Sequence, residues 1–134
     1  MPVQYPSDKR RLSANVTADV TLDLTDCGVV QNVIADGKVI TLPATTAGAC
    51  FTIRNGGVPV TSGAVGTGSN ESVLITISPN ASDKIQGGDF TAADDKDILN
   101  TKATSQVGDE VTLIGDGTDG WIIASMVGTW ARQS

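Results

Sequence analysis

The sequence predicts an all-β domain. Short segments rich in Val, Ile, Leu and Thr recur along the 134 residues, and turn residues, among them 15 Gly, separate them. No segment shows the 3.6-residue apolar spacing of an amphipathic helix. Aromatic residues make up only 4% of the chain, so the core must be mainly aliphatic. We expect an antiparallel β-sandwich, jelly-roll-like or closed into a squat barrel, with an extended N-terminal arm.

Two parts of different character make up the chain. Residues 1–14 form the predicted arm, because Pro2 and Pro6 interrupt regular structure and the residues between them are mostly polar. Residues 15–134 form the predicted single β-domain, a length that suits one core.

The most regular strand pattern spans residues 16–24, where Val16, Val20 and Leu22 alternate with polar residues, which predicts one half-buried strand. Asp36-Gly37 lies between two apolar runs and predicts a two-residue hairpin turn. The other predicted strands are residues 29–35, 38–42, 50–55, 73–78, 84–88, 110–114 and 121–127, with weak strands at 58–61 and 101–105. Residues 94–99 predict a single helical turn, and residues 63–70 a flexible loop.

Composition argues against most kinds of chemistry. The chain has no His, which excludes Ser-His-Asp and Cys-His nucleophile arrangements and the usual zinc sites. Cys27 and Cys50 lack a base to activate them, and we expect free, half-buried thiols. The net charge of -6 repels nucleic acid and anionic membranes, and no apolar run approaches the ~20 residues of a membrane helix. We expect no enzyme, no cofactor, and no nucleic-acid or membrane partner.

Acidic residues gather in one part of the chain. Residues 83–119 hold Asp83, Asp89, Asp94, Asp95, Asp97, Asp109, Glu110, Asp116 and Asp119. A calcium site is one interpretation of residues 116–120, with Asp94, Asp95 and Asp97 as further ligands. The favoured interpretation is a tight turn, because Asp and Gly make that turn without a metal. Trp121 is predicted to be core, whereas Trp130 is either core or an interface anchor.

Two phrases carry a family resemblance: Thr-Leu-Pro-Ala-Thr-Thr-Ala-Gly-Ala-Cys-Phe-Thr-Ile-Arg-Asn-Gly at 41–56 and Val-Thr-Leu-Ile-Gly-Asp-Gly-Thr-Asp-Gly-Trp-Ile-Ile-Ala at 111–124. Together they resemble the pattern of small bacteriophage virion domains found in tail fibres and capsid decoration (cement) proteins. The resemblance covers about residues 36–128.

The resemblance implies a structural protein that assembles as a homotrimer. Decoration proteins of this kind bind the outside of the capsid at threefold or quasi-threefold positions and clamp the major capsid protein. The expected location is therefore the capsid exterior of the virion, after synthesis in the host cytoplasm. By the same resemblance, the predicted capsid contact is the arm, at Pro2, Val3, Gln4, Tyr5, Lys9, Arg10, Arg11 and Leu12. The alternative is a receptor- or glycan-binding module of a tail fibre or baseplate.

Overall fold

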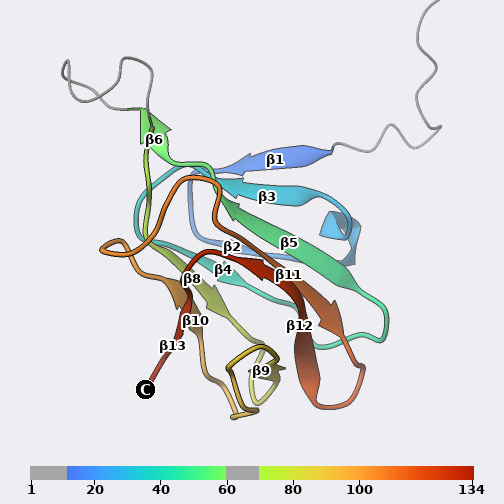
Figure 1. The fold of residues 1–134 in the computed structure, drawn as a ribbon. Helices are drawn as coiled ribbons and strands as arrows, with labels where there is room; N and C mark the ends of the chain where they lie inside the picture. The colour runs from blue at the N-terminus through green and yellow to red at the C-terminus, as the bar shows by residue number, and fades with distance from the viewer. Residues whose placement is uncertain (1–11, 60–69) are drawn as a thin grey trace, which may run out of the picture.

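A computed structural model describes residues 12–59 and 70–134 (Figure 1). The predicted all-β class is confirmed. Within these residues there are thirteen strands and one short 3-10 helix, η1 (Leu24–Asp26). The strands are β1 (Ser13–Val16), β2 (Val20–Thr21), β3 (Val30–Val33), β4 (Lys38–Thr41), β5 (Cys50–Asn55), β6 (Val58–Pro59), β7 (Asn70–Glu71), β8 (Ile75–Ser78), β9 (Lys84–Gln86), β10 (Ile98–Asn100), β11 (Glu110–Gly115), β12 (Gly120–Val127) and β13 (Ala131–Arg132).

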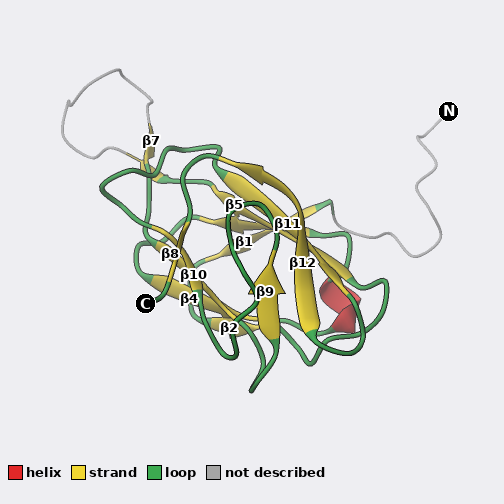
Figure 2. Cartoon of the chain, turned by 60° about the horizontal axis from the view of Figure 1, so that its bottom comes forward, coloured by secondary structure: helices red, strands yellow, loops and turns green. Residues whose placement is uncertain are grey.

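Two sheets pack together as a sandwich. The six-stranded sheet has the order β1-β3-β5-β11-β12-β9, and the five-stranded sheet has the order β13-β10-β8-β4-β2. A small ribbon of β6 and β7 lies at one end, whereas η1 lies at the opposite end (Figures 1 and 2). Because the strands run between these two ends, residues that are far apart in the sequence meet at the same end of the sandwich.

The core lies between the sheets and is mostly aliphatic, as expected. Strands β3, β5, β8, β9, β10 and β11 bury alternate side chains, because successive side chains of a strand point to opposite faces. Phe51 and Trp121 form the main aromatic contact, with ring centroids 5.3 Å apart and planes tilted by 56°. Trp121 is 1% exposed, which confirms its predicted place in the core.

The antiparallel expectation is only half right, because both sheets are mixed. Of the ten pairings between described strands, five are parallel: β1 with β3, β3 with β5, β12 with β9, β2 with β4, and β4 with β8. The parallel pairs arise because the chain crosses from one sheet to the other between strands.

The predicted strand over residues 16–24 was wrong in its continuity. The chain leaves the six-stranded sheet after Val16, crosses at residues 17–19, and enters the five-stranded sheet at Val20. Val16 and Leu22 are buried, so the alternation predicted burial correctly, but Leu24 is 53% exposed in η1.

The predicted hairpin at Asp36-Gly37 was also wrong. A turn is present, with Gly37 at a φ of +73°. It connects β3 and β4, which belong to different sheets and do not pair. The turn is held from outside, because the Leu74 N–H donates to Asp36 Oδ1 and the Gly37 N–H donates to the Leu74 carbonyl.

Two weak assignments fail for the same reason, since tertiary contacts override local preference. The predicted helical turn at residues 94–99 is instead a turn followed by β10, whose Ile98 is fully buried and pairs with Ile77. The predicted weak strand at 101–105 is a turn, closed by hydrogen bonds from the backbone N–H groups of Thr104 and Ser105 to the Thr101 carbonyl.

The remaining predicted strands are confirmed in place. β5 matches residues 50–55, and β11 and β12 form the predicted antiparallel hairpin, with a bulge between Thr112 and Leu113. β6 covers the first half of 58–61, while the remainder and most of the 63–70 loop lie outside the described residues. Cys27 and Cys50 are free and partly exposed, as expected.

Candidate functional site

A buried polar cluster closes one end of the sandwich, and we call it the Asn55 network. Its members are Asn55 at the end of β5, Asn100 at the end of β10, and Asp109 just before β11. Asn55 and Asn100 are fully buried, and Asp109 is 5% exposed. Buried polar groups are stable only when they are hydrogen-bonded, so these three side chains require fixed partners.

Asn55 uses both ends of its amide. Its Nδ2 donates to the Val73 carbonyl and to Asn100 Oδ1, each at 2.7 Å. Its Oδ1 accepts from the backbone N–H groups of Gly57 and Val73, each at 3.2 Å. One side chain therefore joins the end of β5 to the segment before β8 and to β10.

Asn100 extends the network to the last part of the chain. Its Nδ2 donates to Asp109 Oδ2 at 3.0 Å and to the Thr129 carbonyl at 3.1 Å. Asp109 Oδ2 also accepts from the Gln106 N–H at 2.9 Å. The Asn55 network thus holds the 101–109 loop in a defined position.

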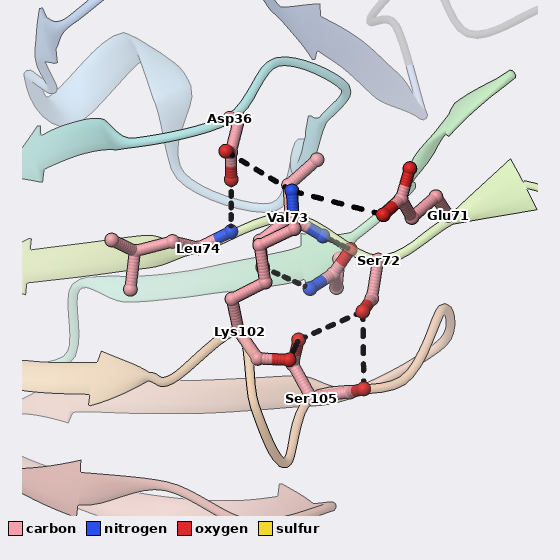
Figure 3. Close-up of polar contacts among 8 residues, drawn as sticks. Asp36, Glu71, Ser72, Val73, Leu74, Lys102 and Ser105 are labelled. Atoms are coloured by element: carbon pink, nitrogen blue, oxygen red, sulfur yellow. Dashed lines mark hydrogen bonds and ion pairs between the residues drawn. The ribbon is translucent and has the colours of Figure 1, made fainter. Parts of the chain in front are cut away.

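A second, exposed set of contacts ties the same end together (Figure 3). Lys102 Nζ donates to Asp36 Oδ2 at 3.1 Å and lies 4.0 Å from Glu71 Oε1. Beside it, Ser105 Oγ donates to Ser72 Oγ at 2.9 Å. These ion pairs are 44% to 61% exposed, so each contributes about 1 kcal/mol or less.

Electrostatics at this end favour ionised carboxylates. The backbone N–H of Leu74, and after it Lys102, hold the pKa of Asp36 below its usual value of 3.8. A lowered pKa keeps Asp36 charged and paired, which suits a structural clamp.

The opposite end is formed by the β11–β12 turn and the 43–49 loop. Asp116 Oδ1 accepts from the backbone N–H groups of Thr118, Asp119 and Gly120. These hydrogen bonds lower the pKa of Asp116, and the bond from the Gly120 N–H has the largest effect. Its carboxylate therefore serves the turn itself, which is the interpretation favoured from the sequence.

The acidic residues do not converge on a shared site. Lys84 pairs with Asp94 at 2.9 Å. Within the described residues, no group of three or more His, Cys, Asp or Glu side chains is arranged to hold a metal ion.

The outer face of the six-stranded sheet is a second candidate surface, and we call it the outer face. Strand register arranges its side chains in rows across the sheet. One row is apolar and consists of Cys50, Ile114 and Ile122. The next row is rich in hydroxyls and consists of Ser13, Val30, Thr52, Thr112 and Ser125. The third row is mixed and consists of Asn15, Asn32, Arg54, Glu110 and Val127.

The outer face combines a polar contact between neighbouring strands with apolar side chains that are exposed to solvent. Thr52 Oγ1 and Thr112 Oγ1 are 3.0 Å apart. Ile114, Ile122 and Val127 are 40%, 43% and 58% exposed. Ile114 and Ile122 lie directly opposite each other on β11 and β12, so their exposed parts adjoin on the outer face.

The predicted site residues are only partly placed. Residues 2–5 and 9–11 of the predicted capsid contact lie outside the described residues. Leu12, the last of that set, is 84% exposed and immediately precedes β1, an edge strand. Trp130 is 6% exposed among the core side chains, and its Nε1 donates to the Val127 carbonyl, which corresponds to the core alternative.

Sequence reasoning missed both the Asn55 network and the outer face. The predicted strand over residues 50–55 ends at Asn55, and the sequence pattern assigns no role to the Asn55 side chain. Its partners Val73 and Asn100 lie 18 and 45 residues away, and no local pattern connects them. The outer face depends on strand order, which alternation alone does not determine.

No family model matches the chain, and no curated protein sequence matches it. In the described part of the chain, no helix has the length and apolar character needed to cross a membrane.

Proposed function

We propose that this chain is a structural virion protein, a homotrimeric decoration protein. It binds the outside of a bacteriophage capsid at threefold or quasi-threefold positions and stabilises the shell. It is not an enzyme, and its partners are other copies of itself and the major capsid protein. The resemblance of residues 41–56 and 111–124 to phage virion domains supports the proposal.

The observation that carries the capsid contact is the position of Leu12. A leucine that is 84% exposed stands at the start of an edge strand, directly after the basic cluster Lys9, Arg10 and Arg11. An exposed leucine next to three cations forms an amphipathic contact suited to an acidic, partly apolar surface. The described domain supplies a folded support for the arm, because hydrogen bonds hold the 101–109 loop at one end of the sandwich and the 116–120 turn at the other.

Cementing follows from multivalency. Each arm need bind only weakly, because the second and third contacts of a trimer are intramolecular and gain effective concentration. Binding that is stronger to the assembled shell than to its dissociated subunits adds to the stability of the shell by linkage.

The test compares three forms of the protein for binding to DNA-filled phage heads that lack it. They are the wild type, a deletion of residues 2–12, and a full-length variant with Lys9, Arg10 and Arg11 all changed to Ser. We expect binding to fall at least about 100-fold on deletion, as avidity from three sites is lost. The triple variant should bind more weakly and lose most of its salt dependence. Undiminished binding by the deletion variant would contradict the arm contact.

A depression on the surface favours one alternative, a receptor- or glycan-binding module of a tail fibre or baseplate. It has a volume of about 250 Å³ and is lined by Asp89, Phe90, Met126, Gly128, Thr129 and Trp130. A concave site lined by aromatic and apolar side chains with a few polar groups is the usual form of a small-ligand site. Binding of the protein to host cells or glycans that is lost in Phe90→Ala would favour this alternative over capsid decoration.

A further inference from the structure

The charges of this protein are unevenly distributed between loops and sheets. The net charge is -6, yet the six strands of the larger sheet contain only Arg54, Lys84 and Glu110 as charged residues. Arg54 and Glu110 stand directly opposite each other in the β5–β11 register, and Lys84 on the edge strand pairs with Asp94. The outer face is therefore electrically balanced in an otherwise acidic molecule.

Exposed apolar side chains concentrate on the same face. In the described residues, the large exposed hydrophobic side chains are Leu12, Leu24, Val107, Ile114, Ile122 and Val127. Three of the six lie on β11 and β12, and none lies on the five-stranded sheet. The five-stranded sheet is also poor in charge, so it is the exposed apolar area that distinguishes the outer face.

We propose that the outer face is the surface through which copies of this chain associate, with the row of Cys50, Ile114 and Ile122 at the centre of the contact. This rests on the self-association in the proposed function and adds which surface makes it.

Electrostatics selects a second copy as the occupant. Two acidic copies repel each other through their loops, and the repulsion is smallest where the approaching surfaces carry no net charge. A basic partner would instead be drawn to the acidic loops. Near a symmetry axis, identical residues of each copy meet, so a charged residue there would face itself. The uncharged row of Cys50, Ile114 and Ile122 meets this condition.

The two rows that follow it toward the Asn55 end of the sheet suit the edge of such a contact. Thr52 and Thr112 supply hydroxyl groups that both donate and accept hydrogen bonds. Beyond them, the neighbouring Arg54 and Glu110 offer one charge of each sign, so each can face its opposite on another copy. An apolar centre with a polar rim is the usual anatomy of a protein interface.

The test measures native mass by light scattering behind a sizing column, over a range of protein concentrations. The variants are Ile122→Glu and the double variant Ile114→Thr/Ile122→Thr, which keeps β-branched residues in both strands. The matched control is Val107→Glu, because Val107 is 40% exposed, close to the 43% of Ile122, but lies in the 101–109 loop. Circular dichroism checks that each variant folds.

We expect the wild type and Val107→Glu to associate alike. Ile122→Glu should raise the concentration at half-association by at least about tenfold, and the milder double variant should shift it in the same direction. If both outer-face variants associate like the wild type, the proposed surface is wrong and the decoration proposal stands. If the wild type is a monomer at every concentration, the surface and the proposed homotrimer both fail, while capsid binding by the arm is still measured separately.

A measurement on the unmodified sequence provides a second check. Cys50 belongs to the apolar row, whereas Cys27 packs against the core, one residue before Gly28, whose N–H donates to the Cys50 carbonyl. Alkylation of Cys50 should slow by at least about fivefold as protein concentration rises through the association range, and by more than the alkylation of Cys27, which packs against the core. Equal rates for Cys50 at low and high concentration, in protein whose native mass does increase, would overturn the proposal.

Discussion

Replacing Asn55 with Ala tests whether the Asn55 network holds one end of the sandwich. The substitution removes four hydrogen bonds, to the Val73 carbonyl and N–H, the Gly57 N–H and Asn100 Oδ1. At about 1 kcal/mol net for each bond, the loss is about 4 kcal/mol, which entry of water into the vacated space reduces to about 3 kcal/mol. The melting temperature should fall by about 10 °C for a domain of this size.

The assay is urea unfolding followed by circular dichroism, with Asn32→Ala as the matched control. Asn32 lies on the neighbouring strand β3, but its side chain is only partly buried and its bonds to Asn15 and Arg54 are long, at 3.3 and 3.4 Å. We expect the control to cost less than about 0.5 kcal/mol. A cost for Asn55→Ala equal to that of the control would refute the reasoning, because the four bonds would then contribute nothing beyond a surface contact.

Two further predictions concern a glycine in a crowded position and the loss of folding stability at low pH. Gly128→Ala should destabilise more than Gly88→Ala in the same urea assay. Both glycines have positive φ, +92° and +57°, but a Cβ on Gly128 would overlap the Asp109 carboxylate, while one on Gly88 meets open space. We expect about 1 kcal/mol for Gly88→Ala and at least about 2 kcal/mol more for Gly128→Ala; equal costs would show that the Asp109 carboxylate moves freely. The pKa values of Asp36 and Asp116 are lowered from the usual 3.8, so the interactions of both carboxylates stabilise the fold above that pH, and this stabilisation is lost as pH falls through the folded pKa values. The urea concentration at half-unfolding, measured from pH 6 to pH 2.5, should therefore decrease once the pH is below about 4. Asp116→Asn should make that decrease smaller. A urea midpoint that stays constant with pH in the wild type would contradict the prediction.

Local pattern was enough to predict the elements that are stabilised by their neighbours in sequence. The β11–β12 hairpin is such a case, because its apolar alternation and its Asp-Gly turn lie within 18 residues. β5 was also predicted to the residue, since its alternation ends at an Asn-Gly stop. In each case the periodicity and the turn chemistry agree.

Sheet membership could not be predicted, because the alternation is the same for either sheet. Val16 and Leu22 are both buried in the core, but Val16 enters it from the six-stranded sheet and Leu22 from the side of the five-stranded sheet. The crossing at residues 17–19 does not interrupt the alternation of apolar and polar residues, so the sequence does not reveal it. Asp36-Gly37 shows the same limit in a turn. Its chemistry predicts a reversal of the chain, but its direction depends on Leu74, 38 residues away from Asp36.

The distribution of charge connects the fold to the proposed function. Of the 14 acidic residues that the structure describes, only Glu110 lies in a strand of the six-stranded sheet, so the loops carry most of their negative charge. Copies can then approach through a face without net charge, while the acidic loops keep them from associating elsewhere. The basic cluster of the arm has the opposite sign and suits a different, acidic partner. In the two proposals, self-association and capsid contact use separate surfaces, the first apolar and without net charge and the second basic.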